Sequence, residues 1–225
     1  MPEPRRGGLH RDRIVAEGVR IADAEGLVGL SMGKVAARLG FTAMSLYRHV
    51  ASKDELVLLM QDAAIGPSPR LAGTGWRAAL EEWTWAALAR FRAHPWMLQA
   101  VAMFGPPATP HQLGWLESAL GALAPTGLAE PEKVNTVLLL SAHVFADLQW
   151  AAFGTAPGVP DPAGYGARLA ELLDADRFPA VLRAVHGGAF APAEGSRAER
   201  DADFAFGLAR ILDGVEHLVR SRTGP

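Results

Sequence analysis

Apolar residues recur at three- and four-residue spacing along almost the whole of this 225-residue chain. That period places them on one face of an α-helix, whereas a half-buried strand would alternate apolar and polar residues. Alternating runs rich in Val, Ile, Thr and Tyr are nearly absent. We therefore predict an all-α fold that glycine and proline divide into separate helices.

The composition is that of a folded, globular chain, with 49% hydrophobic and 20% charged residues. The absence of cysteine excludes disulfides, thiolate zinc sites and cysteine nucleophiles. The N-terminal arginines are not followed by the apolar segment of a secretory signal. A membrane span over the most apolar window, residues 136–153, would bury His143, Asp147 and Gln149 in hydrocarbon. We expect a cytoplasmic protein without a membrane partner.

The first 65 residues contain signals for four helices. Gly26 and Gly40 are positioned to end the first two helices, and Ser31, Thr42 and Ser52 to cap the next three. The ranges expected are 11–25, 32–39, 43–50 and 53 to about 65, with a capping box formed by Ser52 and Glu55. Two short helices around a tight glycine turn, braced by a helix on either side, form a helix-turn-helix, whose second helix enters the major groove of DNA.

The third of these helices has two distinct faces. At about 100° per residue, Leu46 and Val50 share an inward face, and Met44 and Arg48 share the opposite one. Arginine can give guanine a bidentate contact, methionine can touch a thymine methyl, and hydroxyls can donate to phosphates. The hydroxyls of Thr42, Ser45 and Tyr47 and the ammonium of Lys53 are the expected phosphate donors.

Charge is distributed unevenly along the chain. Residues 1–60 carry nine Arg and Lys against seven Asp and Glu, whereas the remainder has a net charge of −4. Phosphate binding is therefore expected in the first quarter of the chain.

The second part of the chain is larger and is also helical. A Gly- and Pro-rich break at residues 66–75 suggests a linker, so we predict a DNA-binding domain at 1–65 and a C-terminal domain at 74–222. Its expected helices cover 76–93, 96–104, 110–123, 132–153, one or two short helices within 167–184 interrupted near Pro179, and 197–222 with a capping box of Ser196 and Glu199.

The segment LSMGKVAARLGFTAMSLYRHVASKDELV, which begins at Leu30, resembles the DNA-binding module of the tetracycline repressor (TetR) family of bacterial regulators. In that module an LG turn, an S/T-LY-x-H-V core and a K-x-x-L step recur. The Trp-rich helix from residue 76 and the closing FAFGLARILDGVEHLV are similar to the regulatory domain of the tetracycline repressor branch.

The resemblance implies a repressor that binds a near-palindromic operator in double-stranded DNA as a homodimer and is released by a small-molecule inducer of unknown identity. Tetracycline repressor has a base-reading arginine early in the second helix, where this chain has Gly33, so its operator sequence does not transfer. The DNA-contacting residues implied by position are Ser31, Lys34, Thr42, Ala43, Met44, Ser45, Tyr47, Arg48, His49 and Lys53.

All six Trp residues follow residue 75. This is more tryptophan than the core of a compact helical bundle normally needs. For a single aromatic residue, core packing is the commoner explanation. As a group they suggest a ligand cavity with a few polar anchors. The candidate ligand-binding residues are Trp83, Phe91, Trp96, Met103, Phe104, His111, Trp115, His143, Gln149 and Trp150.

His143 and Asp147 are four residues apart, which suits a metal ligand pair or a simple hydrogen-bonded pair. Without a third ligand in register we assign no metal and no cofactor. The sequence has no G-x-S-x-G, H-E-x-x-H, P-loop or G-x-G-x-x-G motif, so we do not expect an enzyme. The alternative is a helical protein that binds or processes a small molecule and whose N-terminal module does not read DNA.

The helices expected at 132–153 and 197–222 carry more apolar residues than one core-facing stripe requires. We predict that they pair with their twofold copies in a four-helix dimer interface.

Overall fold

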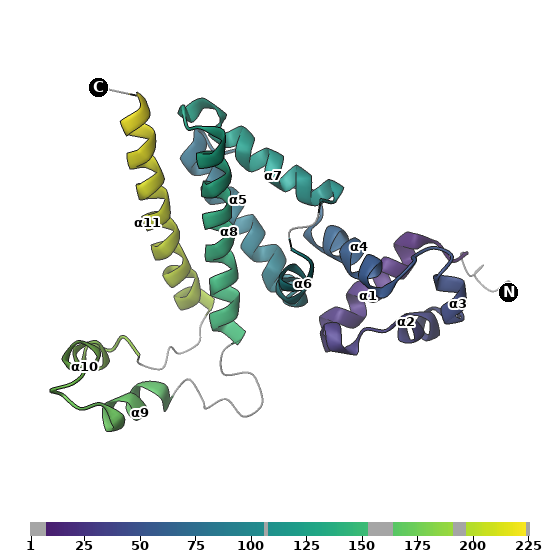
Figure 1. Cartoon of the computed structure of the whole chain (residues 1–225), viewed down its shortest axis with the longest axis horizontal. Coiled ribbons are helices and arrows are strands. Elements are labelled where there is room, and N and C mark those ends of the chain that lie inside the picture. The colour runs from purple at the N-terminus through teal and green to yellow at the C-terminus, as the bar shows by residue number, and fades with distance from the viewer. Residues whose placement is uncertain (1–7, 106–107, 153–163, 191–196, 224–225) are drawn as a thin grey trace. The chain divides into compact units, whose positions relative to one another are not determined.

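The computed structural model describes residues 8–105, 108–152, 164–190 and 197–223 (Figure 1). Across these ranges the regular elements are helices, without a strand. The all-α prediction is therefore confirmed. No helix in the described ranges is both long and apolar enough to cross a membrane.

The first helices form a compact module. They are α1 (Arg11–Glu25), the 3₁₀ turn η1 (Leu27–Gly29), α2 (Met32–Leu39), α3 (Ala43–Leu46) and α4 (Lys53–Ile65). Helix α1 packs against α2 and α4, and α2 packs against α3. The predicted caps are confirmed: Ser31, Thr42 and Ser52 each accept a hydrogen bond from the backbone N–H three residues later. Gly40 ends α2 with φ +78°, which glycine adopts without strain.

Helix α3 is shorter than predicted. The sequence suggested a helix over 43–50, but the regular helix ends at Leu46 and residues 47–49 form a turn. The N–H of His49 bonds to the carbonyl of Leu46, a three-residue spacing tighter than that of an α-helix. Leu46 and Val50 are both buried, so the tightened turn keeps the predicted inward face while the chain leaves the helix.

The next helices are α5 (Trp76–Ala93), α6 (Trp96–Phe104) and α7 (Pro110–Leu123), followed by the 3₁₀ turn η2 (Ala124–Thr126). Their bounds match the predicted ranges. Helix α4 packs against all three helices, and α5 packs against α7. The connecting segment 66–75 has no helix but is tied to α5 and α7. The Ser68 and Ser118 hydroxyls are 2.7 Å apart, and Glu82 accepts from the N–H groups of Ala72 and Gly73.

The last helices are α8 (Glu130–Ala152), α9 (Tyr165–Leu172), α10 (Pro179–His186) and α11 (Arg197–Thr223). Helix α8 begins two residues earlier than predicted, because the Glu132 carboxylate accepts from the N–H of Ala129 and caps the first turn. This bond, together with Arg222, holds the pKa of Glu132 below its usual value of 4.5. The prediction of short helices interrupted near Pro179 is confirmed, because α9 ends at Leu172 and Pro179 starts α10, where a first-turn proline has no N–H to satisfy. The predicted cap Ser196 and the predicted helix end at residue 153 lie outside the described residues.

The chain divides into two compact units, one built from residues up to Ser141 with those from Val219 onward, and one built from Ala142–Leu218. The first unit contains α1 to α7, and the second contains α9, α10 and the greater part of α11. The domain boundary expected between residues 65 and 74 remains a prediction.

Candidate nucleic-acid interface

The turn and helix around α3 expose one face to solvent. Met44 is 72% exposed and Tyr47 is 47% exposed, and Arg48 is also exposed. Leu46 and Val50, on the other face, are 0% and 1% exposed. The division of this segment into an inward and an outward face, predicted from helical spacing, is confirmed. The outward face combines a guanidinium, a thioether and a phenol.

Two hydroxyls mark the start of α3. The Oγ1 of Thr42 accepts from the N–H of Ser45 at 3.4 Å and lies 3.0 Å from the Ser45 Oγ. Ala43 follows the cap and is half-buried. A hydroxyl that accepts a bond as a cap still has its own proton to donate, so Thr42 and Ser45 can turn one proton towards an anion.

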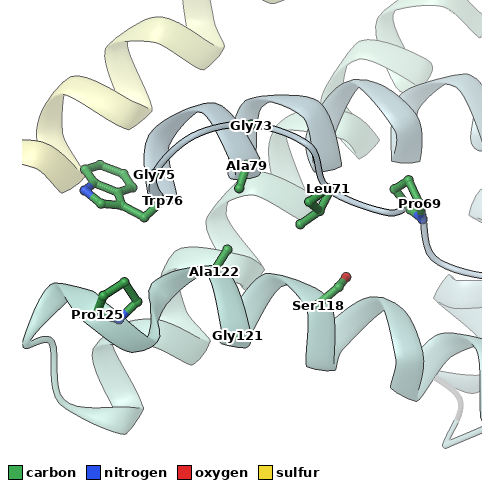
Figure 2. Close-up of a pocket in the computed structure, with 10 residues that line it drawn as sticks. All are labelled: Pro69, Leu71, Gly73, Gly75, Trp76, Ala79, Ser118, Gly121, Ala122 and Pro125. Carbon is green, nitrogen blue, oxygen red and sulfur yellow. The ribbon is translucent and has the colours of Figure 1, made fainter.

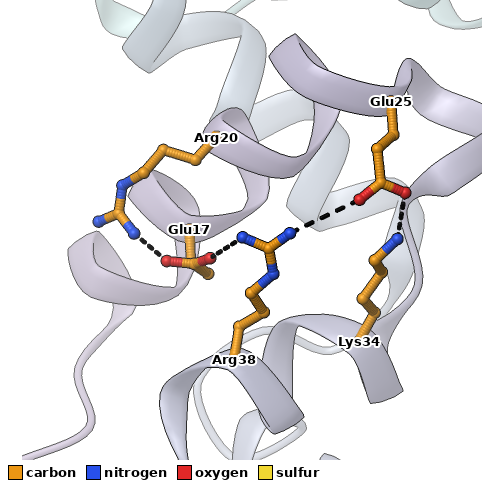
Figure 3. Close-up of polar contacts among 5 residues, drawn as sticks. All are labelled: Glu17, Arg20, Glu25, Lys34 and Arg38. Atoms are coloured by element: carbon orange, nitrogen blue, oxygen red, sulfur yellow. Dashed lines mark hydrogen bonds and ion pairs between the residues drawn. The ribbon is translucent and has the colours of Figure 1, made fainter.

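A network of ion pairs holds α2 on α1 (Figure 3). Arg38 lies 3.9 Å from a Glu17 oxygen and 3.6 Å from a Glu25 oxygen, and Lys34 pairs with Glu25. Arg20 donates to Glu17, whose side chain is almost completely buried. The hydrogen bond from Lys34, with its charge and that of Arg38, lowers the pKa of the Glu25 carboxyl. Lys34 was predicted to contact DNA, and that contact stays a prediction, since its ammonium is paired with Glu25 in this structure.

The remaining predicted DNA contacts lie at the ends of α2, α3 and α4. Ser31 is exposed and caps α2 through the N–H of Lys34. His49 is half-buried, and its backbone carbonyl accepts from the Nε of Arg11 at 3.3 Å, which ties the turn after α3 to α1. Lys53 is exposed in the first turn of α4. The predicted set therefore lies on three consecutive helices of one module.

Trp83 and Trp115, predicted to bind a ligand, form a buried pair between α5 and α7. Their rings meet edge to face at 5.7 Å. The Trp83 indole N–H donates to the carbonyl of Trp115, and the Trp115 indole N–H donates to the carbonyl of Gly66, both at 2.9 Å. Packing and hydrogen bonding thus give both rings a structural role, and their contact with a ligand stays a prediction.

Trp96 and His111 connect the first module to α6 and α7. The Trp96 indole N–H donates to Asp23 of α1 at 2.7 Å. The backbone N–H of His111 donates to Asp62 of α4, and its ring nitrogen lies 3.0 Å from the carbonyl of Asp62. Among the other candidates of this unit, Phe91 is buried, Phe104 is half-buried and Met103 is exposed.

The last three ligand candidates belong to the second unit. The ring of His143 stacks on Phe204, and its Nε2 lies 2.9 Å from the Phe204 carbonyl. Gln149 and Trp150 are exposed near the end of α8. The ten candidates are therefore divided between two units, seven in the first and three in the second. In the described part of the chain, no three His, Asp or Glu side chains meet in a group that could hold a metal ion.

A groove opens between segment 69–75, the start of α5 and the end of α7 (Figure 2). Its volume is about 410 Å³. Its walls are mainly small or apolar, and Trp76 and Pro125 stand at one end. The lining residues are Pro69, Leu71, Gly73, Gly75, Trp76, Ala79, Ser118, Gly121, Ala122 and Pro125. None of the predicted ligand residues belongs to this set.

Sequence reasoning missed the carboxylates that join the first module to α6 and α7. Asp23 accepts from Trp96 and also lies 2.7 Å from the Nδ1 of His94. Asp62 accepts from His111. These partners are 49 to 73 positions apart along the chain, so no local spacing could have paired them.

Known families match both parts of the chain. The family model "Bacterial regulatory proteins, tetR family" matches residues 14–60, and the model "Tetracyclin repressor-like, C-terminal domain" matches residues 68–219. The chain is 40% identical to the HTH-type transcriptional repressor DrrR1 of Streptomyces coeruleorubidus, over 96% of this chain and 80% of that protein. It is 32% identical to an HTH-type transcriptional regulator of Saccharopolyspora erythraea, over 92% of this chain and 84% of that protein.

Solved structures also match nearly the full length. Apo ActR of Streptomyces coelicolor is 28% identical with a TM-score of 0.76, and the match covers 92% of this chain and 94% of that chain. ActR in complex with actinorhodin is 26% identical with a TM-score of 0.78, over 95% of this chain and 99% of that chain. Both of the protein relatives named above are transcriptional regulators.

Proposed function

Since this chain belongs to the TetR family of bacterial helix-turn-helix transcriptional regulators, we propose that it is a cytoplasmic repressor that binds a near-palindromic DNA operator as a homodimer. The observation that carries this proposal is the outward face of Met44, Tyr47 and Arg48, which the buried Leu46 and Val50 hold in place. The function involves no catalytic step.

The roles of the reading residues follow from their chemistry. Arg48 gives a guanine edge a bidentate contact, and Met44 touches a thymine methyl. The remaining residues face the phosphates. They are the hydroxyls of Ser31, Thr42, Ser45 and Tyr47, the Ala43 backbone, the His49 ring and the ammonium groups of Lys34 and Lys53. Gly33 has no side chain that could read a base, so the operator differs in sequence from that of tetracycline repressor.

We further propose that a small molecule bound by the C-terminal domain, residues 74–222, releases the operator. The support is the matched C-terminal family model and the ActR structures in complex with actinorhodin and with (S)-DNPA. The buried aromatic residues of α5 to α7 offer an apolar environment for such a ligand. Release requires the ligand to prefer the conformation that fits DNA less well.

The homodimer is proposed to form through α8 and α11. Leu138 and Leu139 on α8 are 56% and 51% exposed, and Phe206 on α11 is 66% exposed. Exposed apolar side chains of this size on long helices favour burial against a second copy. Light scattering at micromolar concentration should give the mass of a dimer, and a monomer would contradict the two-half-site model.

The test is a selection of random duplex DNA by the purified protein, with sequencing of the retained fragments. An enriched inverted repeat is expected, and its affinity should fall steeply with salt because several phosphate contacts release counterions. An unenriched pool would contradict the proposal and favour a protein that binds small molecules without reading DNA.

A further inference from the structure

Gln61, on α4, is a buried amide without a partner. Its side chain is 0% exposed. Neither its Nε2 nor its Oε1 has a hydrogen-bond partner among the described residues. Buried polar groups are almost always paired, since an unpaired one loses its bonds to water and gains none. Both ends of the amide are therefore free to bond to a buried water or to a ligand from outside the chain.

The position of Gln61 on α4 shows which helices face it. Met60 points at α1, where its sulfur lies close to Gly18, and Asp62 points at α7, where it bonds to His111. Successive residues of an α-helix are turned by about 100°, so Gln61 lies on neither of these two lines. The other helices that pack against α4 are α5 and α6. By this elimination we infer that the Gln61 amide faces α5 and α6.

Helices α5 and α6 offer the amide no partner. Their buried residues are apolar except Thr84, whose hydroxyl donates to the carbonyl of Leu80 at 2.7 Å. The indole N–H groups of Trp83 and Trp96 already donate to other acceptors. The surroundings of Gln61 are therefore an apolar site with one unpaired donor and one unpaired acceptor.

A second buried oxygen, at the start of the helix that bonds to α4 through His111, also lacks a partner. The Oγ1 of Thr109 has no hydrogen-bond partner in the described part of the chain, and Thr109 sits at the start of α7 without capping it. It is two residues before His111, through which α7 bonds to α4. Within the described residues, Gln61 and Thr109 are the only ones with buried side-chain polar atoms that have no partner.

We propose that Gln61 recognises the small-molecule ligand through a paired hydrogen-bond donor and acceptor on one edge of an otherwise apolar ring system. A hydroxyl or N–H beside a carbonyl matches the two ends of the glutamine amide. This inference rests on the proposed ligand-released function and names its polar anchor on α4. Because Gln61 is completely enclosed, a ligand reaches it only by parting α4 from α5 or α6. The same movement displaces α4, the last helix of the module formed by α1 to α4, which we call the reading module.

The test compares wild type with Gln61→Met, which keeps the length of the side chain and removes both polar ends. Gln99→Met, at an exposed position on α6, is the matched control. The probes are actinorhodin, alizarin and salicylamide, with anthraquinone as a ring system that has no adjacent hydroxyl. The readouts are thermal stability without probe, affinity for the selected operator, and the probe concentration that releases the operator.

We expect Gln61→Met to be at least as stable as wild type without probe and to bind the operator within about threefold of wild type. It should need roughly tenfold more of a releasing probe, as expected for the loss of two hydrogen bonds. Gln99→Met should match wild type, and anthraquinone should release neither protein.

Equal release of wild type and Gln61→Met would overturn the assignment. A destabilised Gln61→Met with unchanged release would also overturn it, because the amide would then be satisfied by a structural water. Gln61→Leu replaces Gln61→Met if methionine does not pack in this position. If no probe released wild type from its selected operator, the proposed ligand class would be overturned while the DNA-binding function would stand, whereas a loss of response confined to Gln99→Met would refute Gln61 alone.

Discussion

Asp23 offers a direct test of how the reading module is attached to α6. Its Oδ1 accepts from the indole N–H of Trp96 and lies 2.7 Å from the Nδ1 of His94. Trp96 is almost fully buried, so Asp23→Ala leaves an indole N–H without an acceptor. Such a loss costs about 2 kcal/mol. In a chain of this size that corresponds to a fall in melting temperature of about 4–8 °C.

A double-mutant cycle separates this bond from the other effects of the substitution. Trp96→Phe removes the donor and keeps an aromatic ring, and Asp23→Asn keeps one acceptor oxygen. If the bond is energetically important, Asp23→Ala should cost less free energy in the Trp96→Phe protein than in wild type, by about 1 kcal/mol. Asp23→Asn should lose roughly half of what Asp23→Ala loses.

Urea unfolding of the four proteins measures the coupling free energy. Glu81→Ala, at an exposed position on α5, is a surface control that should leave stability within about 0.5 kcal/mol of wild type. Additive losses in the cycle, within about 0.3 kcal/mol, would refute the argument that Asp23 holds α6 through the indole.

Three further predictions follow from the described contacts. The pKa of Glu25 is lowered by Lys34, so its contribution to stability is complete above the ordinary value of 4.5 and is lost as the pH falls through the folded-state value. Urea unfolding of Glu25→Gln should show a smaller loss in that acidic window than wild type. Gly207→Ala should destabilise the protein by about 1–3 kcal/mol, because the added carbon would lie 2.4 Å from the His143 ring. Gly214→Ala, on the same helix with open space around it, should instead leave the melting temperature unchanged or raise it. Ser52→Ala should cost about 1 kcal/mol through loss of the α4 cap, Ser52→Asp should retain most of it, and equal melting temperatures would contradict the cap's role.

The local part of the fold could be predicted from the sequence. Ser31, Thr42 and Ser52 cap helices through hydrogen bonds that span three residues, and such signals lie within one short window. The proline-bounded α5 and α6 were predictable for the same reason. The break between α9 and α10 was also predictable, because a proline marks the same boundary whether it interrupts a helix or starts a new one.

The buried and exposed faces of residues 43–50 were also predictable, since helical spacing alone separates Leu46 from Met44. Spacing could not show that Lys34 pairs with Glu25, or that Trp96 and His111 bond to carboxylates of the first module. Those contacts depend on how helices cross, which the packing of the whole unit decides. An unpaired amide such as Gln61 cannot be predicted from the sequence for the same reason. Whether a buried amide has a partner depends on how every neighbouring helix packs around it.

The contacts around the reading module fall into two groups with different consequences. Ion pairs within the module, among Glu25, Lys34 and Arg38, hold α2 on α1. Hydrogen bonds also join the module to the following helices. Asp23 of α1 accepts from Trp96 at the start of α6, and Asp62 of α4 accepts from His111 near the start of α7. A shift of α6 or α7 is therefore expected to move α1 and α4, while the ion pairs keep α2 on α1. We expect such a module to move as one body, so a ligand should change the spacing of the two half-sites and weaken binding. The base preference within each half-site should remain the same with and without ligand.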